Sequence, residues 1–594
     1  MKLPLSYYQA NYDHLKQLLS DFQKRDRLFS IGRFVVVLTA AFCGYKVVQN
    51  ALALWVLLLS ISLLVFVVLI FVHVGLRKKK RQKQYLLRVN ENELRYLKGD
   101  LAPFAAGDTY RDSQHLFSHD LDLFGEFSLF QHINRTSTAA GEKHLAEELM
   151  EPAIDKINEK QQAIRELTGK LDWRQQFGAA GMAVEENQSI RVMLEIWLAS
   201  KAKPSLFSNK WFLYALVGVV VILLFNFLRV TSLQNFNILT YALGFNLLLV
   251  FSQFKAIKKE YDMLNKVSRV LAKYADLLIL IEQEDWQSAE LKGLKRKLEN
   301  NNEKAATALG KLAKLLDGFD QMNNAIAVVL SNGFAHYHLH VLRQLFTWKQ
   351  QHGVHINTWI EVLAQFDSYH SVANFSFNHP EFSYPTVSEK PVLQVTELGH
   401  PLLAPDKCVV NDIDFNSFNF SVLTGSNMSG KSTFLRSLGA NLVLAKMGAP
   451  VCANNFVFYP YRLLSSMKLA DSLNREESYF KAEVLRLRAI KEILETDEPC
   501  LLLLDEILRG TNSDDKRKGT RLFMEKVAQY SSIGVVATHD IDIAELAKVQ
   551  PKVFKAMYFE SKVQGGELLF DYQLRQGVCT TPNATELMRN NGII

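Results

Sequence analysis

Three long runs without a charged residue constrain the fold of this 594-residue chain more than any other feature. They cover residues 51–72, 211–228 and 236–254, and each is long enough to cross a bilayer as a helix. A shorter uncharged run at 34–45 lies between Arg33 and Lys46, whose long side chains can reach the two interfaces. Because a backbone in lipid must satisfy its own hydrogen bonds, we expect four transmembrane helices.

The charges that flank these runs predict their orientation. Basic residues precede and follow the first pair, with a cluster at 77–81, and lysines flank the second pair on both sides. Only residues 49–50 and 229–235 separate the members of each pair. Since positive flanks stay in the cytoplasm, we predict two hairpins in the cytoplasmic membrane, with both termini inside the cell. Buried core helices are the alternative, and nucleic-acid binding is a second reading of the basic cluster.

Composition adds weaker constraints. The five cysteines are scattered and include no C-x-x-C pair, which indicates a reducing compartment without a disulfide framework. The first 30 residues are polar and charged, so we expect no cleavable signal peptide. His336 and His340 share one face of a predicted helix, but without an evident third ligand we expect ordinary packed or exposed histidines. The net charge of +7 would suit an anionic partner without identifying one.

The sequence TGSNMSGKST at 424–433 fits G-x-x-x-x-G-K-[ST], the pattern of a phosphate-binding loop. Residues 418–423 alternate like a strand before it, and residues 434–446 are typical of a helix after it. Glycines allow the tight turn that points N–H groups at phosphate oxygens, the lysine adds a positive charge, and the following serine can bind Mg²⁺. The expected nucleotide-binding residues are Gly425, Ser426, Asn427, Met428, Ser429, Gly430, Lys431, Ser432 and Thr433.

Two later strands end in residues that hydrolysis needs. Residues 500–504 form a continuous apolar run, typical of a strand buried on both faces of a parallel sheet. Asp505 follows it and is expected to hold Mg²⁺ together with Ser432, while Glu506 would activate the attacking water. Residues 533–537 form another strand, and His539 follows it, within reach of the γ-phosphate. The sequence therefore predicts an ATPase that uses ATP and Mg²⁺; structural roles for Glu506 and His539 are the alternative.

Three segments together resemble the ATPase domain of the MutS mismatch-repair family, namely 424–433, LLLDEILRGTNSDD at 501–514 and ATHD at 537–540. Residues 128–152, 398–413 and 471–484 resemble its helical core, its ATPase entry and its signature segment. The resemblance implies a homodimer in which Ser478 reaches the γ-phosphate of the partner subunit. It also implies catalytic roles for Asn427 in the phosphate loop, Glu506 as the water-activating carboxylate and His539 as a switch residue.

The chain also departs from that family. No counterpart of the mismatch-reading N-terminal domain is evident, and four predicted spans occupy its place. We therefore predict a multidomain chain that combines an α-helical core or lever domain, an α/β P-loop ATPase domain of ABC type and two transmembrane hairpins. The predicted units are an amphipathic helix at 1–30, hairpins at 31–76 and 206–256, helical core and lever at 77–205 and 257–384, and the ATPase domain at 385–594.

Three functions follow from these features. The first is a membrane-anchored, dimeric ATPase of MutS type. The second adds DNA as a partner, with mismatched or structured DNA bound during repair, because the resemblance is to repair proteins. The third is an ABC-type ATPase that acts on a non-DNA partner or a transport substrate, because spans are fused to a phosphate loop. Against transport, the spans carry no charged residue that would mark a substrate path.

Overall fold

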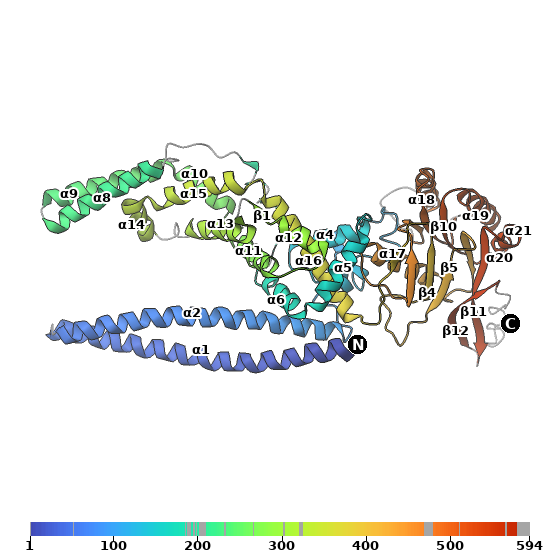
Figure 1. The fold of residues 1–594 in the computed structure, drawn as a ribbon, viewed down its shortest axis with the longest axis horizontal. Helices are drawn as coiled ribbons and strands as arrows, with labels where there is room; N and C mark the ends of the chain where they lie inside the picture. Colours follow the sequence, from blue (N-terminus) through green and yellow to red (C-terminus); the bar gives the residue numbers. More distant parts are fainter. Residues whose placement is uncertain are drawn as a thin grey trace.

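The computed structural model describes residues 2–50, 53–184, 210–230, 233–264, 267–300, 303–319, 325–468, 479–509, 511–564 and 567–578, with a few positions between 186 and 200. Over these ranges the chain is mostly helical, with two mixed sheets and one short two-stranded ribbon. The molecule is elongated: two helical hairpins point toward one end, and both mixed sheets form the other (Figure 1).

The N-terminal hairpin consists of two long helices, α1 (Lys2–Asn50) and α2 (Ala53–Tyr96), which pack along each other. At 1.5 Å per residue they measure about 65–75 Å, roughly twice the hydrocarbon thickness of a bilayer. The unit boundaries expected at residues 30 and 76 fall inside these continuous helices. At the base of the apolar part, Asp26 accepts hydrogen bonds from His73 at 2.6 Å and Lys80 at 2.9 Å, which joins the two helices where their surface becomes polar.

The second hairpin is shorter and consists of α8 (Lys210–Arg229) and α9 (Leu233–Ser252), of 20 residues each. Its tip and the tip of the first hairpin lie at the same end of the molecule (Figure 1). All four hairpin helices are long and apolar enough to cross a membrane. Their apolar side chains are largely exposed to the surroundings, an arrangement that is unfavourable in water and favourable in lipid.

Most of the remaining helices form the body between the hairpins and the sheets. They are α3 (Leu129–Ile133), α4 (Ala139–Met150), α5 (Ile157–Gly169), α6 (Leu171–Gly181), α10 (Phe254–Leu264), α11 (Ser268–Gln283), α12 (Ala289–Arg296), α13 (Ala305–Phe319), α14 (Ala325–Ala335), α15 (Tyr337–His352) and α16 (Ile356–Asn378), with a 3₁₀ turn η1 (Asp108–Tyr110) and the ribbon β1 (Glu299–Asn300) and β2 (Glu303–Lys304). Helix α16 is buried along most of its length and packs against α4 and α5, so it forms the centre of this body.

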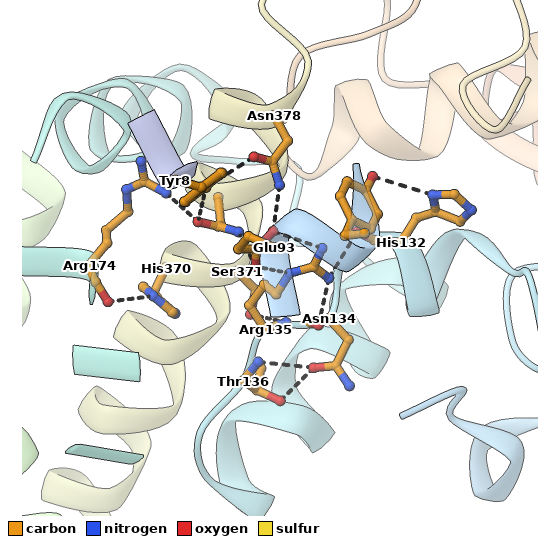
Figure 2. A network of polar contacts seen from close by, with 12 residues as sticks. Tyr8, Glu93, His132, Asn134, Arg135, Thr136, Arg174, His370, Ser371 and Asn378 are labelled. Carbon is orange, nitrogen blue, oxygen red and sulfur yellow. Dashed lines mark hydrogen bonds and ion pairs between the residues drawn. The ribbon is translucent and has the colours of Figure 1, made fainter. Parts of the chain in front are cut away.

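A buried polar network joins the first hairpin to this body (Figure 2). Glu93, near the end of α2, accepts hydrogen bonds from Arg135 at 2.6 Å, Asn374 at 2.9 Å and Asn378 at 2.8 Å. Tyr8 on α1 donates to Asn378 at 3.0 Å. We call these five residues the joint network. Since buried charges are tolerated only when they are paired, the network fixes where the hairpin leaves the body.

The sheet region contains a six-stranded sheet in the order β12-β11-β6-β10-β9-β8 and a four-stranded sheet in the order β3-β7-β4-β5. The strands are β3 (Thr386–Val387), β4 (Leu393–Leu398), β5 (Asn411–Asp414), β6 (Phe420–Thr424), β7 (Asn455–Phe458), β8 (Arg462–Ser466), β9 (Cys500–Asp505), β10 (Ser532–Ala537), β11 (Phe554–Gln564) and β12 (Glu567–Gln576). The helices are α17 (Lys431–Lys446), α18 (Tyr479–Leu494), α19 (Ser513–Val527), α20 (Ile541–Ala544) and α21 (Leu546–Val549).

In the six-stranded sheet, three neighbouring parallel strands end at the same level. Five of its strands are parallel, and only β12 is antiparallel to its neighbour. Ala537 on β10 pairs with Leu423 on β6 and with Asp505 on β9, so these three strands end side by side. Strands β6 and β9 are buried at every position, which the apolar run at 500–504 predicted for β9. The carboxyl ends of adjacent parallel strands are a usual place for a binding site.

Candidate functional site

The loop at 425–430 joins β6 to α17, and its backbone depends on glycine at two positions. Gly425 has a φ of 152° and Gly430 a φ of 103°, values that residues with a side chain rarely adopt. A Cβ atom on Gly425 would lie 2.7 Å from Ser429 Oγ, and one on Gly430 would lie 3.0 Å from a ring carbon of Tyr572. The turn expected from the G-x-x-x-x-G-K-[ST] pattern is therefore present.

Lys431, the first residue of α17, lies in the hollow of this loop and is 6% exposed. Its ammonium donates hydrogen bonds to the carbonyl oxygens of Gly425 and Ser426, both at 2.9 Å. Burial lowers the pKa of Lys431, and the nearby carboxylates of Glu506 and Asp505 partly oppose that effect. A phosphate group in the loop would offer this cation an anionic partner in place of two neutral carbonyl groups.

The neighbouring residue, Ser432, faces the end of β9. Its hydroxyl donates a hydrogen bond to Asp505 Oδ2 at 2.5 Å, and Asp505 is buried. Hydroxyl and carboxylate oxygens are ligands that Mg²⁺ accepts, and Mg²⁺ keeps further positions for water and phosphate oxygens. The two oxygen donors therefore fit the Mg²⁺ that their sequence positions predict.

Glu506 follows β9 with a φ of 47°, a strained value for a residue with a side chain. Its N–H donates to the carbonyl of Ala537 at 2.9 Å, which fixes the turn against β10. Its carboxylate contacts His539 Nε2 directly, and Arg509 Nε lies 3.6 Å away. The hydrogen bond from His539, followed by the charges of His539 and Arg509, lowers the pKa of Glu506 to about 2 against the opposing effect of burial. The carboxylate is therefore ionised at neutral pH.

The strained turn after Glu506 has a support that the sequence did not reveal. Glu483 on α18 is 3% exposed and accepts hydrogen bonds from the backbone N–H groups of Leu508, at 2.5 Å, and Arg509, at 3.0 Å. Leu508 also has a positive φ, of 63°. Burial raises the pKa of Glu483, and the two backbone donors oppose that effect. Its only sequence signal was its place in the segment at 471–484, which carried no indication of this contact.

The remaining predicted residues lie around the loop or outside the described part of the chain. Asn427, Met428 and Thr433 are exposed, so this side of the loop is accessible from outside. The hydroxyl groups of Ser426 and Ser561 on β11 are 2.9 Å apart, and Ser429 is buried. Ser478 falls outside the described residues. The structure thus brings the loop, Asp505, Glu506 and His539 together at one sheet edge, while their roles stay predictions.

A second set of contacts ties this region to the helical body. The carboxylate of Asp120 accepts hydrogen bonds from Ser465 Oγ at 2.6 Å and from the N–H groups of Met467, at 3.1 Å, and Lys468, at 2.8 Å. On α18, Arg486 donates to the carbonyl of Gln114 at 2.9 Å. Residues 465–468 and Arg486 on α18 are therefore both fastened to the stretch 114–120.

The same region of the chain matches known proteins. Residues 421–590 match the family model described as MutS domain V. Over these residues the chain is similar to MutS domain V. The prediction of a MutS relationship, made from the loop and strand-end motifs, is confirmed. The match to MutS domain V includes the loop, Asp505, Glu506 and His539, whereas the four apolar helices lie outside it.

Curated relatives extend the comparison. The chain is 30% identical over 223 residues to the DNA mismatch repair protein MutS of Thermotoga petrophila. The match covers 37% of this chain and 27% of that protein. It is 31% identical over 194 residues to MutS of Pseudothermotoga lettingae, with 32% of this chain and 24% of that protein covered. The chain is 27% identical over 228 residues to MutS of Staphylococcus aureus, and the match covers 36% of this chain and 25% of that protein. The chain thus spans about a quarter of the length of these MutS relatives.

Proposed function

We propose that the chain is a membrane-anchored ATPase of MutS type that binds and hydrolyses ATP with Mg²⁺. One observation carries the proposal: the glycine loop with Lys431, the Ser432–Asp505 pair and the Glu506–His539 pair meet at one edge of a parallel sheet. Phosphate binding, metal binding and water activation need these three groups within reach of one another. The relationship to MutS supports ATP as the nucleotide.

The residues divide the work as follows. The loop N–H groups and Lys431 would bind the phosphates, and Ser432 and Asp505 would hold Mg²⁺, which would supply charge neutralisation to the phosphates. Glu506 accepts a hydrogen bond from the attacking water and takes its proton, because its carboxylate is ionised at neutral pH. His539 contacts that carboxylate directly and would orient it, and the proposal places it within reach of the γ-phosphate. Glu483 positions the turn that carries Glu506.

We also propose a homodimer with two shared nucleotide sites. The exposed side of the loop, with Asn427 and Met428, would face the second subunit, whose Ser478 would complete the site in trans. Closure on ATP and release after hydrolysis would reach the helical body through Asp120 and Arg486. The turnover rate per subunit should then rise with protein concentration; a rate independent of concentration down to monomeric protein would contradict the dimer.

The two hairpins support the proposed membrane anchoring. Their tips share one end of the molecule, and the sheet region lies at the other (Figure 1). This arrangement supports a multi-pass protein of the cytoplasmic membrane, with both termini and the ATPase region in the cytoplasm, as the basic flanks predict. The proposed units are the N-terminal helix 1–30, the hairpins 31–76 and 206–256, the helical parts 77–205 and 257–384, and the ATPase region 385–594. The first of these units continues into the hairpin without a helix break.

DNA is the proposed partner because the matched relatives are named DNA mismatch repair proteins. Mismatched or structured DNA bound during repair is the specific form of this proposal. The second candidate is an ATPase of ABC type that acts on a non-DNA partner or a transport substrate, and the four apolar helices favour it. Salt-dependent binding of duplex DNA would support the first candidate, since each phosphate contact releases counterions.

The test uses the full chain in nanodiscs, with ATP turnover measured alone and with homoduplex, mismatched or branched DNA. Glu506→Gln should retain labelled ATP but turn it over at least about 100-fold more slowly. Glu545→Gln, at an exposed site on a turn between α20 and α21, is the matched control and should behave like the natural chain. Failure of the natural chain to retain ATP would refute the ATPase. ATP turnover without DNA binding at low salt would favour the non-DNA candidate.

A further inference from the structure

Helix α14 has the reverse of the pattern expected for a helix exposed to water. Its 11 residues, AIAVVLSNGFA, include no charged side chain. Val329 and Leu330 are 52% and 54% exposed, whereas Asn332 is fully buried. Asn332 donates to the carbonyl of Val328 at 2.8 Å and contacts His338, so its amide is satisfied inside the fold. A helix with its polar group inside and its apolar groups outside is suited to lipid rather than water.

The contacts of α14 place it at the depth of the bilayer core. Gly333 lies against Leu243 and Leu247 of α9, since a Cβ atom on Gly333 would be 3.7 Å from Leu243 and 4.0 Å from Leu247. Helix α9 ends at Ser252, so these two residues lie about 7–14 Å from its cytoplasmic end at 1.5 Å per residue. Half of a bilayer core measures about 15 Å. Figure 1 shows α14 beside the base of the α8–α9 hairpin.

A hydrogen bond fastens α14 at this depth. Asn246, in the middle of α9, is 2% exposed and donates to the carbonyl of Gly333 at 2.7 Å. An amide in hydrocarbon needs such a partner, because leaving it without one costs several kcal/mol. At 11 residues, α14 is too short to cross a bilayer, a length that is typical of buried, re-entrant or interfacial segments. The exposure of Val329 and Leu330 argues against a fully buried core helix.

We propose that α14 is a fifth membrane element: it is inserted into the cytoplasmic leaflet against α8 and α9, and lipid acyl chains cover Val329 and Leu330. The proposal rests on the membrane anchoring proposed above. It gives the membrane a direct contact with the lever helices, because α14 leads into α15, which packs on α13. The rings of Tyr214 on α8 and His340 on α15 also stack at 5.3 Å. Movement of α13 and α15 would therefore move a segment held in lipid.

The test measures which solvent surrounds each position. Single cysteines replace Leu330, Ile222 on α8 or Leu522 on α19 in a full chain whose five native cysteines are serine, and each carries a nitroxide label in liposomes. These three side chains are 54%, 62% and 56% exposed, so the labels are matched in accessibility. Collisions with oxygen, which concentrates in lipid, are compared with collisions with a nickel chelate that stays in water.

The ratio of oxygen collisions to nickel collisions should be at least about tenfold higher at positions 330 and 222 than at position 522. The label at position 522 should collide mainly with the nickel chelate. Lipid at 222 with water at 330 would overturn the insertion of α14 and leave the anchoring intact. Water at 222 would overturn the membrane position of the α8–α9 hairpin, and with it the insertion of α14. Should the cysteine variants fail to fold, a lipid-soluble diazirine in liposomes of the unaltered chain gives the same comparison, read from the peptides that contain α8, α14 and α19.

Discussion

Replacing Glu483 with glutamine should slow ATP hydrolysis without weakening ATP binding. The buried carboxylate holds the N–H groups of Leu508 and Arg509 at 2.5 and 3.0 Å, and thereby the strained turn that presents Glu506. Glutamine keeps one acceptor oxygen and places an NH₂ group against the second N–H, so one hydrogen bond to a charged group is lost. Such a bond contributes about 1.5–3 kcal/mol. If the loss falls on the alignment of Glu506, kcat decreases about 10- to 150-fold.

The assay separates alignment from binding. Steady-state turnover of the full chain in nanodiscs gives kcat, and a fluorescent ATP analogue gives the dissociation constant, which should stay within about twofold of the natural value because the loop around Lys431 is untouched. Glu492→Gln is the matched control, since Glu492 lies on the same helix and is exposed beside Arg488. An unchanged kcat in Glu483→Gln would refute the positioning role. Equal losses of kcat in both variants would indicate a general effect on α18.

Three further outcomes are expected. Gly430→Ala should weaken the binding of labelled ATP, measured on a filter, by about 5- to 150-fold, because alanine at a φ of 103° is strained by about 1–3 kcal/mol. Glu93→Gln leaves Arg135 buried without its charge partner, at a cost of about 3–5 kcal/mol, so hydrogen exchange in the last turn of α2 should accelerate at least about 100-fold. Glu506 has its pKa lowered from 4.5 to about 2, worth about 3 kcal/mol, so its stabilising contact is complete above pH 4.5 and is lost as the pH falls toward 2. The excess thermal stability of the natural chain over His539→Ala should therefore shrink as the pH falls below 4.5 toward 2.

The site was predictable from sequence where its parts are local. The loop from Gly425 to Lys431 is a contiguous pattern, and Asp505 and Glu506 follow a strand whose apolar run identifies it. Glu483 was not predictable, because its contact with residue 508 depends on how α18 packs against the turn after β9. The joint network was hidden for the same reason, since Glu93 and Asn378 are distant in sequence.

The hairpins show a different limit of sequence reasoning. Four spans were expected from uncharged runs, and the described part of the chain has four helices that are long and apolar enough to cross a membrane. The expected unit boundary at residue 30 rested on a change from polar to apolar residues, but helical hydrogen bonds continue through such a change, so α1 is unbroken. Helix α14 was missed because its continuous apolar run, residues 325–330, is much shorter than a membrane span.

The length of α2 has a consequence for how two copies meet. Beyond residue 76 the helix continues for 20 residues to Tyr96, a rigid post of about 30 Å between the apolar part and the helical body. In the proposed membrane setting, every copy carries its sheet region at one fixed height above the lipid and in one orientation. Two copies then meet by lateral diffusion in the plane of the membrane. Because most of their rotational freedom is already lost, association costs less entropy, and even a weak contact between ATP-loaded faces suffices to pair them.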